Sequence, residues 1–137
     1  MKHFIDILDH TPDELVHVLD RAAALKARRR DGIPDRPLAG RILGLLFEKP
    51  SLRTRVSLEA AAVSLGGSAL FLSTNGRPPE ARESLADQAR VLSRYVDAIS
   101  IRAFSHNVIT TFAEWSSVPV INALSDYNHP CQALADI

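Results

Sequence analysis

The segment Ile42-Leu43-Gly44-Leu45-Leu46-Phe47 (ILGLLF) is a short, uninterrupted apolar run. A run of this length is typical of a β-strand buried on both faces, and such strands occur mainly in parallel sheets. It is followed at once by Glu48-Lys49-Pro50-Ser51-Leu52-Arg53-Thr54-Arg55, which places two arginines and two hydroxyl groups within five residues. The strand therefore indicates the class of fold, and the polar segment behind it raises the question of a ligand.

Around this run the chain alternates between helical and strand patterns. A capping box at Thr11-Pro12-Asp13-Glu14 begins a helix that ends at Asp31 to Pro34. The further expected elements are helix 51–65, strand 69–72, helix 83–95, strand 98–101, helix 108–115 and strand 118–121. Repeated strand-helix units predict an α/β fold, a three-layer sandwich with a four-stranded parallel sheet flanked by helices.

The composition excludes several classes of function. The chain has 137 residues, the size of one domain, and its sixteen basic residues balance sixteen acidic ones. Zero net charge indicates no nucleic-acid or membrane partner, and the basic Arg28 to Arg30 cluster is interpreted as solvated charge. No membrane span or signal peptide is apparent, and the single cysteine suits a reducing compartment, so a cytoplasmic location is expected.

Polar side chains follow three of the expected strands. In a doubly wound parallel sheet, ligands bind beyond the carboxyl ends of the strands. The candidates there are Ser51, Arg53, Thr54 and Arg55 after the first strand, Arg102 after the third, and Asp126, Asn128, His129 and Gln132 after the fourth. This set predicts a site for a small anion.

The helix that begins near Ser51 has the chemistry of a phosphate cradle. Its first N–H groups have no partner within the helix, and its dipole places partial positive charge there. Arg53 is favoured as the phosphate ligand, because a guanidinium grips two oxygens at once, while Arg55 is expected to pair with Glu59. The alternatives are that Ser51 only caps the helix and that Arg102 forms a structural salt bridge. Cys131 is interpreted as a packing residue rather than a nucleophile.

Two motifs at these positions resemble the signatures of the aspartate/ornithine carbamoyltransferase family. Ser51-Leu52-Arg53-Thr54-Arg55 is similar to the family's Ser-Thr-Arg-Thr-Arg loop, and His129-Pro130-Cys131-Gln132 to its His-Pro-x-Gln signature. The flanking segments resemble the ornithine carbamoyltransferase branch more than the aspartate branch: FEKPS at 47–51, RVLSRYVDAI at 90–99, IRAFSH at 101–106 and HPCQALAD at 129–136.

The resemblance implies that residues 1–137 form a carbamoyl phosphate-binding domain. It places Ser51, Arg53, Arg102 and the backbone from Leu52 to Thr54 on the phosphate. It assigns catalysis to Thr54, Arg102 and His129, which would point at the carbamoyl oxygen, and places Gln132 on the amide, with Pro130 and Cys131 in the same substrate-binding signature. The implied reaction transfers the carbamoyl group to the δ-amine of ornithine, giving citrulline and phosphate in arginine biosynthesis, without metal or organic cofactor.

The chain also departs from the family pattern. Leu52 stands where the family commonly has Thr, and Pro78 aligns with a loop glutamine that usually reaches a neighbouring subunit; Arg77 or Arg82 is a candidate replacement. The family's second, ornithine-binding domain is expected to be absent from this chain, which would then bind phosphate weakly and be inactive alone. A homotrimer is expected, with helix 56–65 in the core or at a subunit contact.

Two alternatives stay open at this point. One is carbamoyl transfer to another acceptor, such as aspartate, acetylornithine or putrescine. The other is a non-catalytic anion-binding or assembly domain.

Overall fold

A computed structural model describes residues 2–137 of the chain. Its centre is a parallel sheet of four strands, β1 (Ile42–Phe47), β2 (Ser68–Ser73), β3 (Ala98–Arg102) and β4 (Val120–Asn122). Their order in the sheet is β2-β1-β3-β4, so the chain crosses from β2 back past β1 to β3. The predicted α/β fold with a four-stranded parallel sheet is confirmed.

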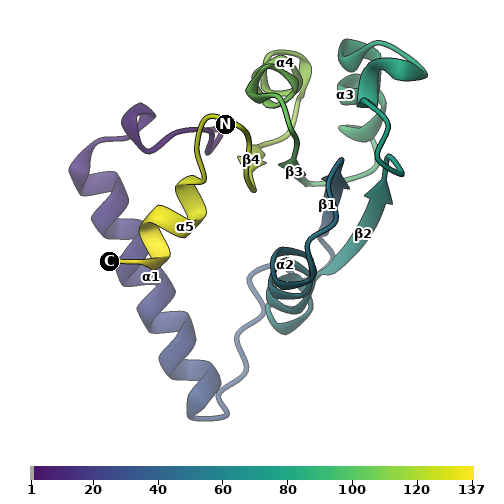
Figure 1. The fold of residues 1–137 in the computed structure, drawn as a ribbon. Coiled ribbons are helices and arrows are strands. Elements are labelled where there is room, and N and C mark those ends of the chain that lie inside the picture. Colours follow the sequence, from purple (N-terminus) through teal and green to yellow (C-terminus); the bar gives the residue numbers. More distant parts are fainter. Residues whose placement is uncertain (1) are drawn as a thin grey trace.

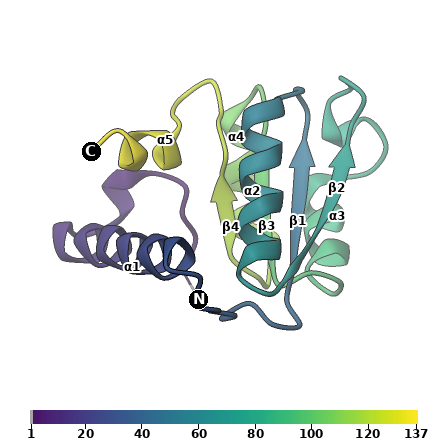
Figure 2. The ribbon, with the colours of Figure 1, turned by 90° about the horizontal axis from the view of Figure 1, so that it is seen from below.

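Helices cover the sheet on both faces (Figure 1). Helix α2 (Leu52–Ser64) lies on one face, and α3 (Leu85–Leu92) and α4 (His106–Trp115) lie on the other. Helix α1 (Pro12–Arg30) stands apart on the α2 side, next to the short α5 (Pro130–Ala135) (Figure 2). The three-layer sandwich is therefore confirmed, with α1 and α5 as additions to it.

The core lies chiefly between the sheet and the α3–α4 layer. Ile99 and Ile101 of β3, Ile109 and Phe112 of α4, and Val120 of β4 are fully buried. Of the helices on the opposite face, α2 has only Ala62 buried and α1 contains no buried residue. Most of helix 56–65, left open as core or subunit contact, is thus exposed in this chain.

Element boundaries differ from the sequence predictions where serine side chains intervene. Helix α3 begins at Leu85, two residues later than expected, because the Ser84 hydroxyl caps it by accepting the Asp87 N–H at 3.1 Å. Strand β4 begins at Val120 rather than at Val118, because the Val118 N–H is taken by the Ser116 hydroxyl at 3.1 Å in a tight turn.

The N-terminal segment joins the sheet beside β4, which the sequence patterns did not predict. Phe4 forms a parallel bridge with Ile121, donating its N–H to the Val120 carbonyl at 2.8 Å and accepting the Asn122 N–H at 2.8 Å. Two short 3-10 turns, Ile7–Asp9 and Pro79–Ala81, were also not predicted.

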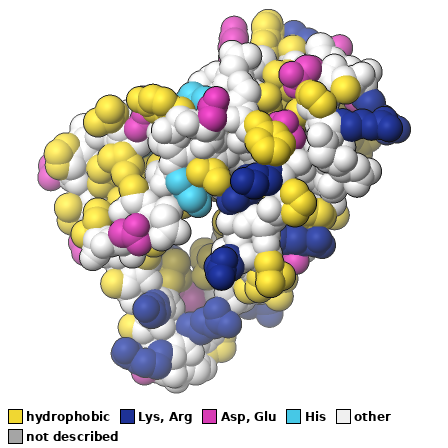
Figure 3. Space-filling model, in the orientation of Figure 1, with side chains coloured by type: hydrophobic (Ala, Val, Ile, Leu, Met, Phe, Trp, Pro, Cys, Tyr) yellow, Lys and Arg dark blue, Asp and Glu magenta, His cyan; other side chains and the backbone are white. Residues whose placement is uncertain are grey.

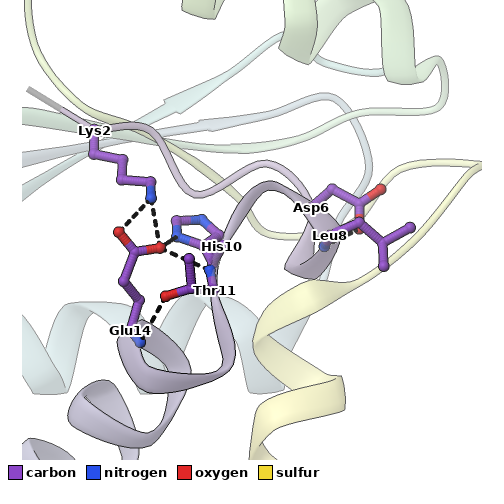
Figure 4. Close-up of polar contacts among 6 residues, drawn as sticks. All are labelled: Lys2, Asp6, Leu8, His10, Thr11 and Glu14. Carbon is purple, nitrogen blue, oxygen red and sulfur yellow. Dashed lines mark hydrogen bonds and ion pairs between the residues drawn. The ribbon is translucent and has the colours of Figure 1, made fainter.

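Helix α1 begins with the predicted capping box (Figure 4). The Glu14 N–H donates to the Thr11 hydroxyl at 3.2 Å, and the Thr11 N–H donates to the Glu14 carboxylate at 2.8 Å. Lys2 adds a contact of 2.7 Å to the same carboxylate. These bonds, that from Lys2 foremost, hold the pKa of Glu14 below its ordinary value. Neither α1 nor any other helix within residues 2–137 combines the length and apolarity needed to cross a membrane.

Candidate anion-binding site

All four strands point toward one edge of the sheet, where α2 begins and the loop from β4 leads into α5 (Figure 2). In the space-filling view, histidine and cationic side chains border a hollow near the middle of the visible face (Figure 3). The predicted site residues that contact one another lie at this edge.

The start of α2 combines a helix cap with free donors. The Ser51 hydroxyl accepts the Thr54 N–H at 3.4 Å and donates to Thr54 Oγ1 at 3.0 Å. The N–H groups of Leu52 and Arg53 have no acceptor within residues 2–137. Helix capping by Ser51 and an anion cradle were treated as alternatives, but the two are compatible here.

Arg102 connects the end of β3 to this helix. Its Nη1 donates to Thr54 Oγ1 at 3.3 Å, so that oxygen accepts from both Ser51 and Arg102. The hydroxyl hydrogen of Thr54 is consequently free to donate to a third group. Arg102 Nε is buried with no acceptor in the described chain, and no carboxylate in that part of the protein pairs with it. The structural salt bridge considered for Arg102 is therefore not formed, and its charge is left for a ligand.

His129 lies close enough to Arg102 for the guanidinium charge to affect its ionisation. Burial, and then the positive charge of Arg102, lower the pKa of His129 below its ordinary value. The imidazole is therefore neutral at neutral pH and has one N–H to donate. Its buried Nδ1 has no partner among residues 2–137.

The remaining signature residues do not all turn toward this corner. Leu52 and Arg53 are exposed on the first turn of α2, Leu52 with 79% of its surface accessible. Gln132 donates instead to Asp136 at 2.9 Å, one turn further along α5. Pro130 is buried at the start of α5, and burial raises the pKa of the Cys131 thiol, as befits a packing residue.

Arg55 adopts the structural position that its spacing predicts. It pairs with Glu59 at 3.2 Å, and its guanidinium stacks 3.5 Å from the centre of the Phe71 ring. The predicted pairing with Glu59 is confirmed, and Phe71 of β2 adds a contact that helix spacing alone does not reveal.

Asp126 and Asn128, which followed a strand and were grouped with the ligand candidates, make internal hydrogen bonds instead. Asp126 accepts the His106 N–H at 2.9 Å, and Asn128 accepts from the Asn122 side chain. Both side chains are thus engaged within the described chain, and a role as anion ligands stays a prediction. Both stabilise the loop before His129, and nothing in their spacing distinguishes that role from ligand binding.

The loop after β2 encloses a separate cleft of about 540 Å³. Arg77, Pro78 and Arg82 line it together with Thr74 and Gln88. None of the strand-end residues at the α2 corner lines this cleft.

Glu48 is a buried residue of the site that sequence reasoning missed. Only 8% of its surface is accessible, and its carboxylate accepts the Phe104 N–H at 3.3 Å. Burial is the main cause that raises its pKa. The available signal in the sequence was its position directly after a buried apolar strand. In the structure its backbone N–H donates to the Arg102 carbonyl at 2.9 Å.

Within residues 2–137 no cluster of three or more His, Cys, Asp or Glu side chains offers a metal site. The donors that do converge are a partly buried guanidinium, a free threonine hydroxyl, a neutral imidazole and helix N–H groups. An α/β domain with such donors at its strand ends is an anion-binding domain.

Comparison with known proteins narrows that class. Residues 2–137 match the family described as aspartate/ornithine carbamoyltransferase, carbamoyl-P binding domain. The chain belongs to this family, as the two signature motifs indicated.

The relatives that it resembles are enzymes of greater length. It is 50% identical over 136 residues to an ornithine carbamoyltransferase of Symbiobacterium thermophilum, covering 99% of this chain and 44% of that protein. It is 47% identical over 137 residues to an anabolic ornithine carbamoyltransferase of Pseudomonas aeruginosa, covering 100% and 45%. The chain thus spans less than half the length of these relatives.

Solved structures agree on the fold. The ornithine carbamoyltransferase of Pyrococcus furiosus superposes with a TM-score of 0.96 at 46% identity, over 98% of this chain and 43% of that one. A mutant N-acetyl-L-ornithine transcarbamylase, complexed with carbamyl phosphate and N-succinyl-L-norvaline, superposes with a TM-score of 0.89 at 36% identity, over 99% and 46%.

Proposed function

We propose that the strand-end corner binds carbamoyl phosphate and that the protein takes part in carbamoyl transfer to ornithine. The observation that carries the proposal is the hydrogen-bonded set of Ser51, Thr54 and Arg102, in which the partly buried Arg102 has a buried Nε without an acceptor and no carboxylate partner in the described chain. A buried donor without an acceptor is unfavourable unless a ligand completes the site.

The phosphate is placed at the start of α2. The free N–H groups of Leu52 and Arg53, the Ser51 hydroxyl and the guanidinium groups of Arg53 and Arg102 are its ligands. Helix N-termini and arginine forks both suit phosphate oxygens. The exposed Arg53 closes over the anion when it binds.

The carbamoyl group then lies toward Thr54 and His129. Attack by an amine on the carbamoyl carbon builds negative charge on the carbamoyl oxygen. Thr54, Arg102 and neutral His129 each have a donor for that charge, and one such donor typically accelerates a reaction by about 10² to 10³. Phosphate leaves with its charge already balanced, so the mechanism calls on no cofactor and depends on positioning for the remainder.

Gln132 is proposed to bind the amide of the carbamoyl group only after its own side chain is released from Asp136. Its amide is held by Asp136 in the structure, so it reaches the carbamoyl amide only after that bond is released. Pro130 and Cys131 contribute by fixing the start of α5 rather than by direct chemistry.

The acceptor is proposed to be ornithine, with citrulline as product and arginine biosynthesis as the setting, because relatives near 50% identity are named ornithine carbamoyltransferases. Acetylornithine is the competing acceptor, in view of the likeness to an N-acetyl-L-ornithine transcarbamylase. The residues that select the acceptor are proposed to lie in a second domain, and residues 1–137 alone are proposed to be inactive. An assay with ornithine and with acetylornithine, on a protein as long as the relatives, decides between the two acceptors.

We further propose a cytoplasmic homotrimer. Exposed Val56 and Val63 on α2, with 52% and 64% of their surfaces accessible, suit a contact between copies. Arg77 or Arg82 is then proposed to reach the anion of a neighbouring subunit in place of the missing glutamine. Light scattering tests the trimer, and Arg82→Ala should weaken carbamoyl phosphate binding only in the assembled protein.

The central test is calorimetric titration with carbamoyl phosphate. Arg102→Ala should weaken binding by about 10- to 100-fold, the loss expected for hydrogen bonds to a charged group. Arg94→Ala is the matched control, since Arg94 is an exposed arginine beyond α3 and its loss changes the net charge equally. Equal affinity of the wild-type and Arg102→Ala proteins would refute the site.

A further inference from the structure

Asn122, the last residue of β4, is a buried side chain with a full set of partners. None of its surface is accessible. Its Nδ2 donates to the Ile5 carbonyl at 3.0 Å and to Asn128 Oδ1, and its Oδ1 accepts the Leu124 N–H at 2.9 Å. A reversed amide would set its oxygen against two acceptors, so these partners define its orientation.

These bonds connect segments that are distant in the chain. The backbone of Asn122 donates to the Phe4 carbonyl at 2.8 Å and accepts from the Cys131 thiol at 3.6 Å. Asn122 thus contacts Asn128 and Cys131, which lie on either side of the His129-Pro130 pair.

The turn that follows has an unusual backbone. Leu124 has φ of 131°, a region that side chains other than glycine rarely adopt. Its N–H is held by Asn122 and its carbonyl accepts the Ala103 N–H at 3.0 Å. A disfavoured conformation persists only where its surroundings impose it, and such residues concentrate at functional sites.

His129 depends on this support for its direction. No hydrogen bond to its ring is formed within the described residues, and its Nδ1 is buried without a partner there. The ring therefore takes its place beside Arg102 from the backbone on either side of it. That backbone is what Asn122 holds.

We infer that Asn122 is a positioning residue of the carbamoyl phosphate site, which holds the loop from Leu124 to Cys131 so that the His129 imidazole lies beside Arg102. A role of Asn122 in catalysis rests on the proposed function. The placement of His129, however, can be measured without any ligand.

The first experiment is an NMR titration of the His129 imidazole. In the wild-type protein its pKa should lie below the ordinary 6.5, because of burial and the nearby Arg102 charge. In Asn122→Ala the loop loses its support, so the pKa of His129 should rise toward 6.5. In Asn128→Ala, which removes one of the three bonds from a partly exposed position, a smaller rise is expected.

The matched control is Val120→Ala. Val120 is fully buried two residues earlier on the same strand, so its truncation destabilises the protein without touching the loop. The pKa of His129 should stay as in the wild type. If Asn122→Ala does not fold, the pKa of His129 in Asn128→Ala tests the inference instead. An unshifted His129 in the Asn variants that fold overturns the inference, as does an equal shift in Val120→Ala.

The second experiment measures carbamoyl phosphate affinity of the same proteins. Asn122→Ala should bind about tenfold more weakly, the loss expected for one hydrogen bond to a charged ligand, and Val120→Ala should bind as the wild type does. Unchanged affinity in Asn122→Ala, beside a wild type that binds, overturns the role at the site. A wild type that does not bind refutes the proposed function instead, while the His129 titration still decides the placement.

Discussion

Strand β3 and helix α1 are stabilised in opposite ways. Strand β3 pairs with a neighbour on each side, and its Ile99, Ser100 and Ile101 are fully buried. Helix α1 has 19 residues, none of them buried, and is held at its ends by a capping box and by an Arg28–Asp35 ion pair of 3.2 Å. An isolated helix of this length is marginal in water. The sheet therefore depends on contacts across the chain, and α1 on local signals.

This difference predicts which mutations lower the stability of the whole protein and which lower only that of one helix. A change in the sheet layers should alter the unfolding of the whole protein, whereas a change in α1 should alter local helix stability. The site belongs to the first region, because Arg102 ends β3 and the loop before His129 leaves β4. Four experiments test this contrast between β3 and α1.

Truncation of the core should have the largest effect. Phe112→Ala removes a fully buried ring from α4 and should lower the free energy of unfolding by about 3 to 5 kcal/mol in denaturant titrations. Val16→Ala on α1, where 53% of the side chain is accessible, should change it by about 0.5 kcal/mol or less. Similar losses in the two variants would contradict the contrast between the regions.

A second experiment addresses Gly67, between α2 and β2, which packs against the linker from α1 to the sheet. A Cβ at Gly67 would lie 2.9 Å from the Arg41 carbonyl oxygen and 3.0 Å from that of Leu38, so Gly67→Ala forces backbone to shift. It should destabilise the protein by about 1 to 3 kcal/mol. Gly44→Ala in β1 is the control and should be milder in thermal unfolding, because its new Cβ would come no closer than 3.4 Å to any atom, the nearest being in the Val96 side chain.

Loss of the α1 cap should have a local effect. Thr11→Ala removes the hydroxyl that accepts the Glu14 N–H and should weaken the helix by about 1 kcal/mol. Amide exchange in the first turns of α1 should become faster while exchange in β3 stays unchanged. Thr11→Ser retains the acceptor and should behave as the wild type. A lower free energy of global unfolding in Thr11→Ala, with faster amide exchange in β3, would argue against a separate α1.

Acid should distinguish the same two regions through exposed carboxylates, with the smallest effect. The Ile42 N–H and Arg41 hold the pKa of Asp97 below 3.8, as Lys2 and Thr11 hold that of Glu14 below 4.5. A lowered folded-state pKa contributes stability above the ordinary value, and that contribution is lost as pH falls through the lowered one.

The matched variants are Asp97→Asn and Glu14→Gln. Between about pH 5 and pH 2, Asp97→Asn should flatten the acid dependence of global unfolding, and Glu14→Gln should flatten only that of α1 helicity. Circular dichroism and denaturant titration at each pH separate the two. An acid profile of global unfolding that responds to Glu14→Gln and not to Asp97→Asn would reverse the comparison.

Local sequence patterns predicted the parts of the molecule that local chemistry forms. The apolar run at 42–47, the capping box at Thr11 and Glu14, and the Arg55–Glu59 pair are all present as predicted. Each rests on neighbours within a few residues, so periodicity and spacing suffice. The signature motifs likewise indicated the family before the fold was known.

Contacts between distant segments were not predictable in this way. Arg102 was expected at the edge, but its bond to Thr54 spans 48 residues. Asp126 and Asn128 were grouped with the ligand candidates because they follow the fourth strand, and the structure shows them bonded to His106 and Asn122. Strand β4 and the N-terminal segment pair because both edges need partners, and neither sequence alone carries that information.

The parallel α/β sheet, the order of its elements and the donors available at its edge follow from the amino-acid sequence, because strand burial and helix capping depend on nearby residues. Which of those donors face one another depends on how the folded chain packs. This packing left Arg102 without a carboxylate within the described chain, made His129 neutral by burial beside a cation, and supported that histidine through Asn122. The physical reason is that charge balance and burial are properties of packed neighbours, which the chain acquires only when it folds.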